Sequence, residues 1–116
     1  MNISQRTVGD VVIVDVSGKI TLGDMGDAAL KDKMRSLVQQ GYKKVLLNLG
    51  DVSYVDSAGL GEIVQAYATV SKNGGTLKLL NVTKRIKDLL SITKLLTVFD
   101  TFDSEAEAVT SFSAPK

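Results

Sequence analysis

The stretch DVSYVDSAGLGEIVQA, residues 51–66, carries the side chains of this chain that are best suited to chemistry. Asp56 and Ser57 stand where a strand should end and a helix begin, and Gly59 and Gly61 follow in the first helical turns. A serine hydroxyl there can act as an N-cap for an unpaired N–H. It can also carry a phosphoryl group, which the helix dipole and free N–H groups tolerate. Asp56 can cap the helix, orient the hydroxyl or repel an added phosphate.

The two glycines have a structural and a functional explanation. Both could let the first helical turn pack closely against the sheet. Each glycine costs about 1 kcal/mol relative to alanine inside a helix, so a close approach is needed to offset that cost. The approaching group belongs to this chain or to a partner, and the spacing leaves both open. Loops at the carboxyl ends of strands are also where open α/β sheets expose ligand sites.

Composition excludes several kinds of catalytic and metal site. The 116 residues include no histidine and no cysteine, so a Ser-His-Asp triad, a histidine-ligated zinc, a cysteine metal site and a disulfide cannot form within this chain. The sequence contains neither a Gly-x-Ser-x-Gly elbow around Ser57 nor the glycine-rich nucleotide motifs. We therefore expect no catalytic residue, no metal site and no cofactor.

Charge and hydropathy bear on partners and location. The chain has 14 basic and 13 acidic side chains and a net charge of +1, which gives no reason to expect nucleic acid as a partner. The basic run of Lys84, Arg85 and Lys87 is interpreted as a solvated helix face. No apolar run approaches the roughly 20 residues of a membrane-spanning helix, and the first ten residues lack a signal-peptide core. We expect a cytoplasmic protein without membrane insertion.

Periodicity predicts strands that alternate with helices. Residues 1–8 and 11–20 form an antiparallel pair around a Gly9-Asp10 turn. A helix follows from about Asp24 to Val38, and the apolar centre of residues 43–52 is typical of a strand covered on both faces. The remaining elements are a helix from about Ala58 to Asn73, a strand at 76–82, a helix at 84–96, an edge strand at 97–102 and a helix at 104–112 opened by a Ser104–Glu107 capping box.

This order predicts a single α/β domain over residues 1–112, followed by a frayed tail at 113–116. Strands that alternate with helices give parallel pairs joined by crossovers. We therefore expect a mixed, mostly parallel sheet of four to five strands, with an antiparallel N-terminal strand and about four helices packed on it.

Residues 55–64, VDSAGLGEIV, resemble the signature of the STAS domain, the family of bacterial anti-sigma factor antagonists. The family motif is Asp-Ser-(Ser/Thr/Ala)-Gly-(Leu/Ile)-Gly at the start of a helix that follows a buried strand. The resemblance covers nearly the whole chain, since residues 11–20 are similar to the second strand, 43–60 to the central strand and 74–109 to the C-terminal third. The residues that match the motif are Asp56, Ser57, Ala58, Gly59, Leu60 and Gly61.

The resemblance implies a phosphorylation switch. Ser57 would be the serine phosphorylated by a partner, an anti-sigma factor with kinase activity that itself binds the ATP. The unphosphorylated antagonist binds the anti-sigma factor and so frees the sigma factor; phosphorylation blocks binding and a phosphatase restores it. Leu60, if exposed, would supply apolar contact area. The implied partner-binding residues of this helix are Asp56, Ala58, Gly59, Leu60 and Gly61.

A second segment of the implied surface departs from the family pattern. Members often carry an Asp shortly after the Gly that ends the second strand, near the kinase-binding surface. Here SGKITLGDMGD, residues 17–27, has Thr21 at that offset, followed by Gly23 and Asp24. Thr21 and Asp24 are the candidates for this part of the surface.

Three other functions compete with the switch. One is phosphate or nucleotide binding, which no glycine-rich motif supports but which the resemblance leaves open, because the family includes members with nucleotide interactions. Ser57 could be the nucleophile of an enzyme with a lysine as base. The chain could instead be a STAS-like scaffold or accessory subunit of a signalling or lipid-transport complex, in which Ser57 is mainly an N-cap. The scaffold hypothesis predicts that the partner tolerates Ser57→Asp. The switch predicts lost binding, because phosphorylation adds a charge of about −1.5 to −2 at this point.

Overall fold

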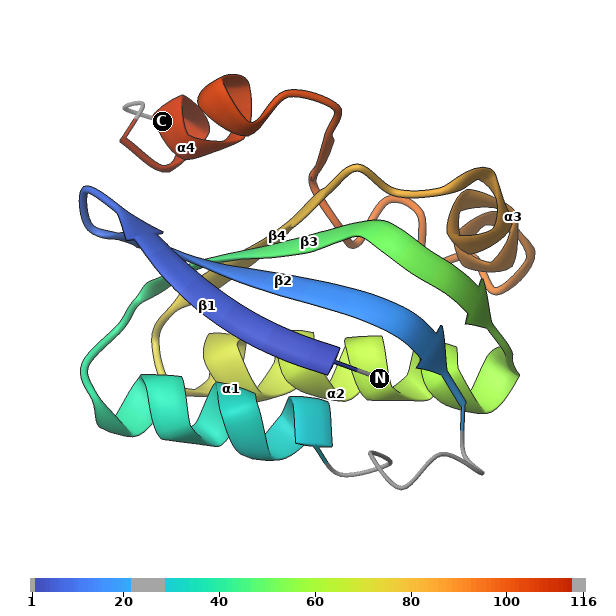
Figure 1. The fold of residues 1–116 in the computed structure, drawn as a ribbon, viewed down its shortest axis with the longest axis horizontal. Coiled ribbons are helices and arrows are strands. Elements are labelled where there is room, and N and C mark those ends of the chain that lie inside the picture. The colour runs from blue at the N-terminus through green and yellow to red at the C-terminus, as the bar shows by residue number, and fades with distance from the viewer. Residues whose placement is uncertain (1, 22–28, 114–116) are drawn as a thin grey trace.

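The computed structural model describes residues 2–21 and 29–113. Its five strands form one sheet in the order β1-β2-β3-β4-β5, with β1 and β2 antiparallel and the other neighbouring pairs parallel (Figure 1). The predicted mixed α/β sheet, its antiparallel start and the order of the elements are confirmed. These elements are β1 (Asn2–Val8), β2 (Val11–Ile20), α1 (Ala29–Gln39), β3 (Lys44–Val55), α2 (Ser57–Lys72), β4 (Thr76–Leu80), α3 (Lys84–Ile92), β5 (Thr101–Phe102) and α4 (Glu105–Ser113).

Some boundaries differ from the prediction for reasons of packing. β3 continues to Val55 because Val52 and Val55 are buried and Val55 still pairs with Ile20 of β2. β5 is limited to two residues, which pair with Leu79 and Leu80 at the end of β4. α4 includes Ser113, which the sequence assigned to the tail. The predicted helix start near Asp24 and tail residues 114–116 lie outside the described ranges.

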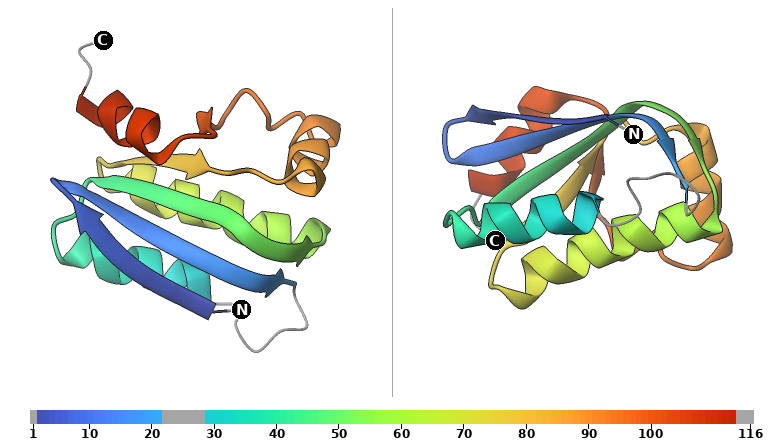
Figure 2. Two further views of the ribbon diagram at one scale, coloured as in Figure 1. Left: turned by 45° about the horizontal axis from the view of Figure 1, so that its top comes forward. Right: turned by 60° about the horizontal axis from the view of Figure 1, so that its bottom comes forward.

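Helices cover the two faces of the sheet unequally. α1 and α2 lie side by side on one face, and α4 lies on the other (Figures 1 and 2). The main core fills the space between the sheet and α1, α2 and α3. A smaller cluster lies under α4 and consists of Val11, Ile13, Leu46, Leu80 and Ala108. Both faces of β2 and β3 are therefore buried, which explains their uninterrupted apolar runs. No helix in the described ranges is long and apolar enough to span a bilayer.

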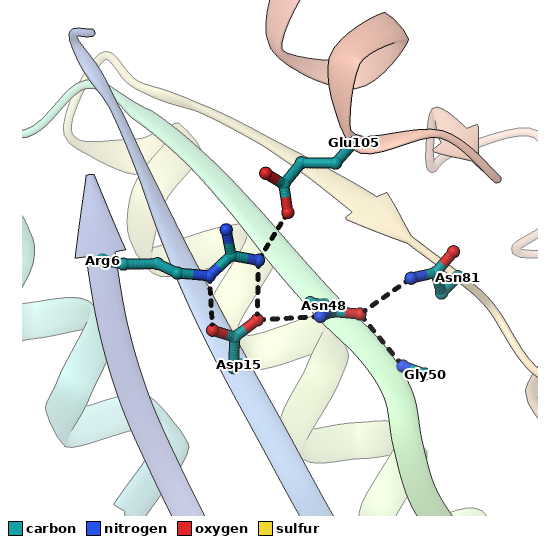
Figure 3. A network of polar contacts seen from close by, with 6 residues as sticks. All are labelled: Arg6, Asp15, Asn48, Gly50, Asn81 and Glu105. Carbon is teal, nitrogen blue, oxygen red and sulfur yellow. Dashed lines mark hydrogen bonds and ion pairs between the residues drawn. The ribbon is translucent and has the colours of Figure 1, made fainter. Parts of the chain in front are cut away.

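The turn after β4 brings α3 beside the last residues of β3. β4 pairs with β3 only as far as Leu80 and Asn48, and the chain then turns at Asn81, whose φ is +55°. The Asn48 side-chain oxygen accepts hydrogen bonds from Asn81 Nδ2 at 3.3 Å and from the Gly50 N–H at 3.1 Å (Figure 3). This asparagine therefore holds the turn against β3 at the point where the two strands separate.

A polar network joins the first turn of α4 to the strands of the sheet. The Arg6 guanidinium on β1 binds Asp15 of β2, with Nε–Oδ2 at 2.8 Å, and also binds Glu105 (Figure 3). Asn48 donates to Asp15 at 2.8 Å. The hydrogen bond with Arg6 is the main cause of the lowered pKa of Asp15 and of Glu105. The network thus stabilises the ionised carboxylates and fixes the start of α4.

We expect Arg6→Gln to loosen α4 and to reduce the acid sensitivity of its docking. The side chains of Arg6, Asp15 and Glu105 are 43%, 29% and 40% exposed, so solvent screening limits the effect to about 1 kcal/mol or less. Because both carboxyl pKa values are lowered, the stabilisation is present at neutral pH. The stabilisation is lost as the pH falls below the ordinary pKa values, 3.8 for Asp15 and 4.5 for Glu105, toward the lowered pKa values of the folded protein.

Amide hydrogen exchange in α4, measured from neutral pH down through this acid range, is the readout. Lys44→Gln is the matched control, because it removes a different exposed ion pair, the one between Lys44 of β3 and Asp10 of the β1–β2 turn. Equal protection of α4 in the parent and in Arg6→Gln at neutral pH would contradict the assigned role.

Candidate functional site

Asp56 is the residue that caps α2. Its backbone is extended, with φ −106° and ψ −177°, and its Oδ1 accepts a hydrogen bond from the Gly59 N–H at 2.7 Å. Its carbonyl accepts the Leu60 N–H at 2.8 Å, which starts the helical ladder. The structural explanation that made Ser57 the N-cap is therefore wrong: the carboxylate one residue earlier has that role.

Ser57 is the first residue of α2 and is exposed. Its hydroxyl makes no hydrogen bond with any residue in the described ranges. The N–H groups of Ser57 and Ala58 are likewise without a partner among those residues, since Asp56 satisfies only that of Gly59. The structure thus presents a free hydroxyl at the positive end of a 16-residue helix.

Gly59 lies against the end of β2. A Cβ at this position would lie 1.7 Å from the Ile20 carbonyl oxygen and 2.6 Å from its carbonyl carbon, so no other residue fits without movement of the backbone. The expectation that the first turn packs closely against the sheet is confirmed for Gly59. This contact fixes the distance between α2 and the strand edge, and with it the position of Ser57.

Gly61 and Leu60 differ from the expectations in opposite ways. A Cβ at Gly61 would meet nothing within 4 Å, so packing against the sheet does not explain this glycine. Leu60 is 3% exposed and belongs to the main core. Leu60 was expected to supply apolar contact area only if it were exposed, and this condition is not met, because the phase of the helix turns its side chain toward the sheet. The exposed motif residues are Ser57 and Ala58, with Asp56 and Gly61 half-buried beside them.

Thr21 lies next to this helix start, whereas Asp24 falls in a part of the chain that is not described. Thr21 follows Ile20 directly, and Ile20 both pairs with Val55 and contacts Gly59. The structure therefore brings Thr21, which is half-buried, to the same edge as Ser57.

Arg85 is a residue of this edge that the sequence did not reveal. Its Nε donates to the Val55 carbonyl at 3.4 Å, and its guanidinium carbon lies 5.4 Å from the centre of the Tyr54 ring. The basic run was interpreted as a solvated face, and Arg85 is exposed like its two neighbours, but its side chain also contacts the end of β3. The sequence signal that could have identified Arg85 is the order of the elements, because α2 and α3 both begin at the carboxyl edge of a parallel sheet.

We expect the stability of the two neighbours Asp56 and Ser57 to respond differently to alanine. Asp56→Ala removes the cap and should lower the free energy of unfolding by about 1 kcal/mol. Ser57→Ala removes no hydrogen bond and should stay within about 0.5 kcal/mol of the parent. Urea denaturation measures both, and the reverse order would show that Ser57 is the cap.

The two glycines form a second matched pair. Gly59→Ala should destabilise the fold by about 3 kcal/mol, because the backbone of Ile20 has to move. Gly61→Ala should stabilise it by about 0.4–1 kcal/mol, since alanine is the better helix former and meets no neighbour. Denaturation midpoints test this, and equal effects at both positions would contradict the packing described for Gly59.

Sequence comparisons identify relatives that cover most of this chain. The model of the STAS domain family matches residues 2–108. The anti-sigma-B factor antagonist of Bacillus subtilis is 34% identical over 100 residues, which cover 86% of this chain and 89% of that protein. A Thermotoga neapolitana protein, provisionally assigned as an anti-sigma factor antagonist, is 39% identical over 104 residues, or 90% of this chain and 91% of that protein.

Solved structures agree with this assignment. The crystal structure of a Thermotoga maritima protein with the same provisional assignment has a TM-score of 0.85 at 26% identity and covers 97% of this chain and 95% of that one. The phosphorylated form of the Bacillus cell fate determinant SpoIIAA has a TM-score of 0.73 at 18% identity, covers 96% of this chain and 99% of that one, and shares its fold. The family match, the relatives and the observed sheet lead to one conclusion: this chain belongs to the STAS domain family.

Proposed function

We propose that this STAS domain is an anti-sigma factor antagonist, a binding protein and not an enzyme. It docks on an anti-sigma factor through the exposed start of α2 and so releases a sigma factor for transcription. Support comes from the Bacillus subtilis relative, which is named an anti-sigma-B factor antagonist. Further support comes from the motif itself, which leaves a compact surface of Asp56, Ser57, Ala58 and Gly61 open to a partner.

Ser57 is the proposed phosphoacceptor, and its free hydroxyl is the observation that carries this proposal. The scaffold hypothesis needs Ser57 mainly as an N-cap, but Asp56 has that role. The exposed hydroxyl has no structural partner in the described ranges, so a kinase could reach it without opening the fold. Transfer moves the γ-phosphoryl group of ATP to the Ser57 oxygen and releases ADP and the hydroxyl proton.

Phosphorylation would act on docking and leave the fold intact. The start of α2 tolerates an anion, because the helix dipole is positive there and the N–H groups of Ser57 and Ala58 are free. Docking is different, because a partner would have to desolvate about −1.5 to −2 added charges directly beside Asp56. That cost and the repulsion between like charges oppose binding.

Gly61 supports close docking at the same surface. Glycine at this helical position costs about 1 kcal/mol relative to alanine, and the open space around it shows no neighbour in the described chain that would require it. A partner that approaches the α2 backbone there would explain the residue. Thr21 and Asp24 are proposed to extend this surface on the segment after β2. Gly59 and Leu60 would shape the surface from beneath.

The proposed partners follow from the switch. One is an anti-sigma factor with serine kinase activity, which holds the ATP. The other is a phosphatase that removes the phosphoryl group from Ser57. Neither nucleic acid nor a membrane is required for this cycle.

We expect phosphate transfer from labelled ATP to the parent protein, but not to Ser57→Ala, in a lysate of the source organism. Because Ser57→Ala keeps the fold, loss of label would identify the site. Label on both proteins would place the phosphoacceptor elsewhere. No label on either would favour the scaffold, provided that a known antagonist is labelled by its own kinase under the same conditions.

The kinase can be purified by following this labelling activity and then used to measure binding. Ser57→Asp should weaken the affinity of this protein for the kinase at least about tenfold, because the substitution places an anion in the interface. Gln65→Glu is the matched control, since it adds one negative charge to an exposed position of α2 two turns away. Equal affinity of the parent and Ser57→Asp would reject the switch.

A further inference from the structure

We infer that Arg85 receives the phosphoryl group of Ser57: its guanidinium exchanges the Val55 carbonyl and the Tyr54 ring for the phosphate oxygens. Phosphorylation would then rearrange Arg85 and Tyr54, at the end of β3, in addition to modifying Ser57. This inference rests on the proposed phosphorylation of Ser57 and adds the residue that responds to it.

The position of Arg85 is the first support. Its Nε lies 3.4 Å from the carbonyl oxygen of Val55, and Val55 precedes Ser57 by two residues, a span of at most about 7 Å of chain. Arg85 is the second residue of α3. The turn that places α3 there is fixed by the hydrogen bond from Asn81 to Asn48.

The existing contacts of Arg85 are weak enough to be exchanged. A donor–acceptor distance of 3.4 Å exceeds the usual 2.7–3.2 Å of an N–H···O bond. Tyr54 is 42% exposed, so its contact with the guanidinium is well hydrated and weak. A phosphate dianion offers stronger bonding, because the guanidinium fork can bind two of its oxygens at once.

The neighbouring lysines do not share this position. Lys84 and Lys87 are exposed, and their side chains make no hydrogen bond or ion pair within the described ranges. Arg85 alone of the three is held on the end of β3. The chain therefore provides charge-matched controls on the same helix.

The exchange would change what a partner meets. In the unphosphorylated protein, Arg85 covers one face of an exposed tyrosine and offers a positive charge at the Val55 carbonyl, two residues before Ser57. After the exchange the positive charge is neutralised by the phosphate, and the Tyr54 ring loses its cover. A partner fitted to the first arrangement would lose contacts at Tyr54 and Arg85 in addition to meeting the phosphate.

The test uses protein carrying genetically encoded phosphoserine at position 57, so that it does not depend on a kinase. A ³¹P NMR titration gives the second pKa of the phosphoserine, which is ordinarily about 6. A nearby guanidinium favours the dianion and lowers this pKa. We expect Arg85→Gln to raise the pKa by at least about 0.5 unit relative to the parent, Arg85→Lys to give an intermediate value and Lys87→Gln to leave it within about 0.2 unit.

The ring resonances of Tyr54 provide the second readout. They should differ between the phosphorylated and unphosphorylated parent, and this difference should be much smaller in Arg85→Gln, where no guanidinium can leave the ring. Backbone amide spectra verify that every variant is folded. Equal phosphoserine pKa values in the parent and Arg85→Gln, or an unchanged Tyr54, would overturn the inference. Neither result would bear on whether a kinase labels Ser57, so the failure of this inference and that of the proposed function remain distinguishable.

Discussion

The contact between Gly59 and the carbonyl of Ile20 is the constraint on which the site depends. It allows the first turn of α2 to lie against the last residue of β2 with no side chain between them. The same residue, Ile20, pairs with Val55 at the end of β3. Ile20 therefore joins two parallel strands and a helix, and Ser57 and Thr21 lie at the same edge of the sheet as a result.

This arrangement separates structural and functional roles among adjacent residues. Asp56 caps the helix, Gly59 packs it and Leu60 enters the core. Ser57 has none of these roles, so its hydroxyl remains available at a helix terminus whose stability does not depend on it. A residue that is modified and restored repeatedly benefits from this separation, because its chemistry can change without loss of the fold.

The opposite face of the sheet is organised by a different interaction. Arg6, Asp15 and Glu105 join β1, β2 and α4, and Asn48 connects them to the turn after β4 (Figure 3). That turn decides where α3 begins and so where Arg85 lies. The polar network on the outer face thus has a structural connection to the edge that carries Ser57, although none of its members belongs to the docking surface.

Local sequence patterns determined the order of the elements, the mixed sheet, the position of the motif and the need for close packing near Gly59. They did so because strand and helix periodicities, caps and glycine conformations are set by residues a few positions apart. Local spacing left Asp56 and Ser57 both able to cap α2, and the structure assigns the cap to Asp56. Only the tertiary structure decided that Leu60 is buried and that Arg85 lies beside Tyr54. The phase of a helix on its sheet and the point at which neighbouring strands separate depend on packing between distant segments, which local spacing does not encode.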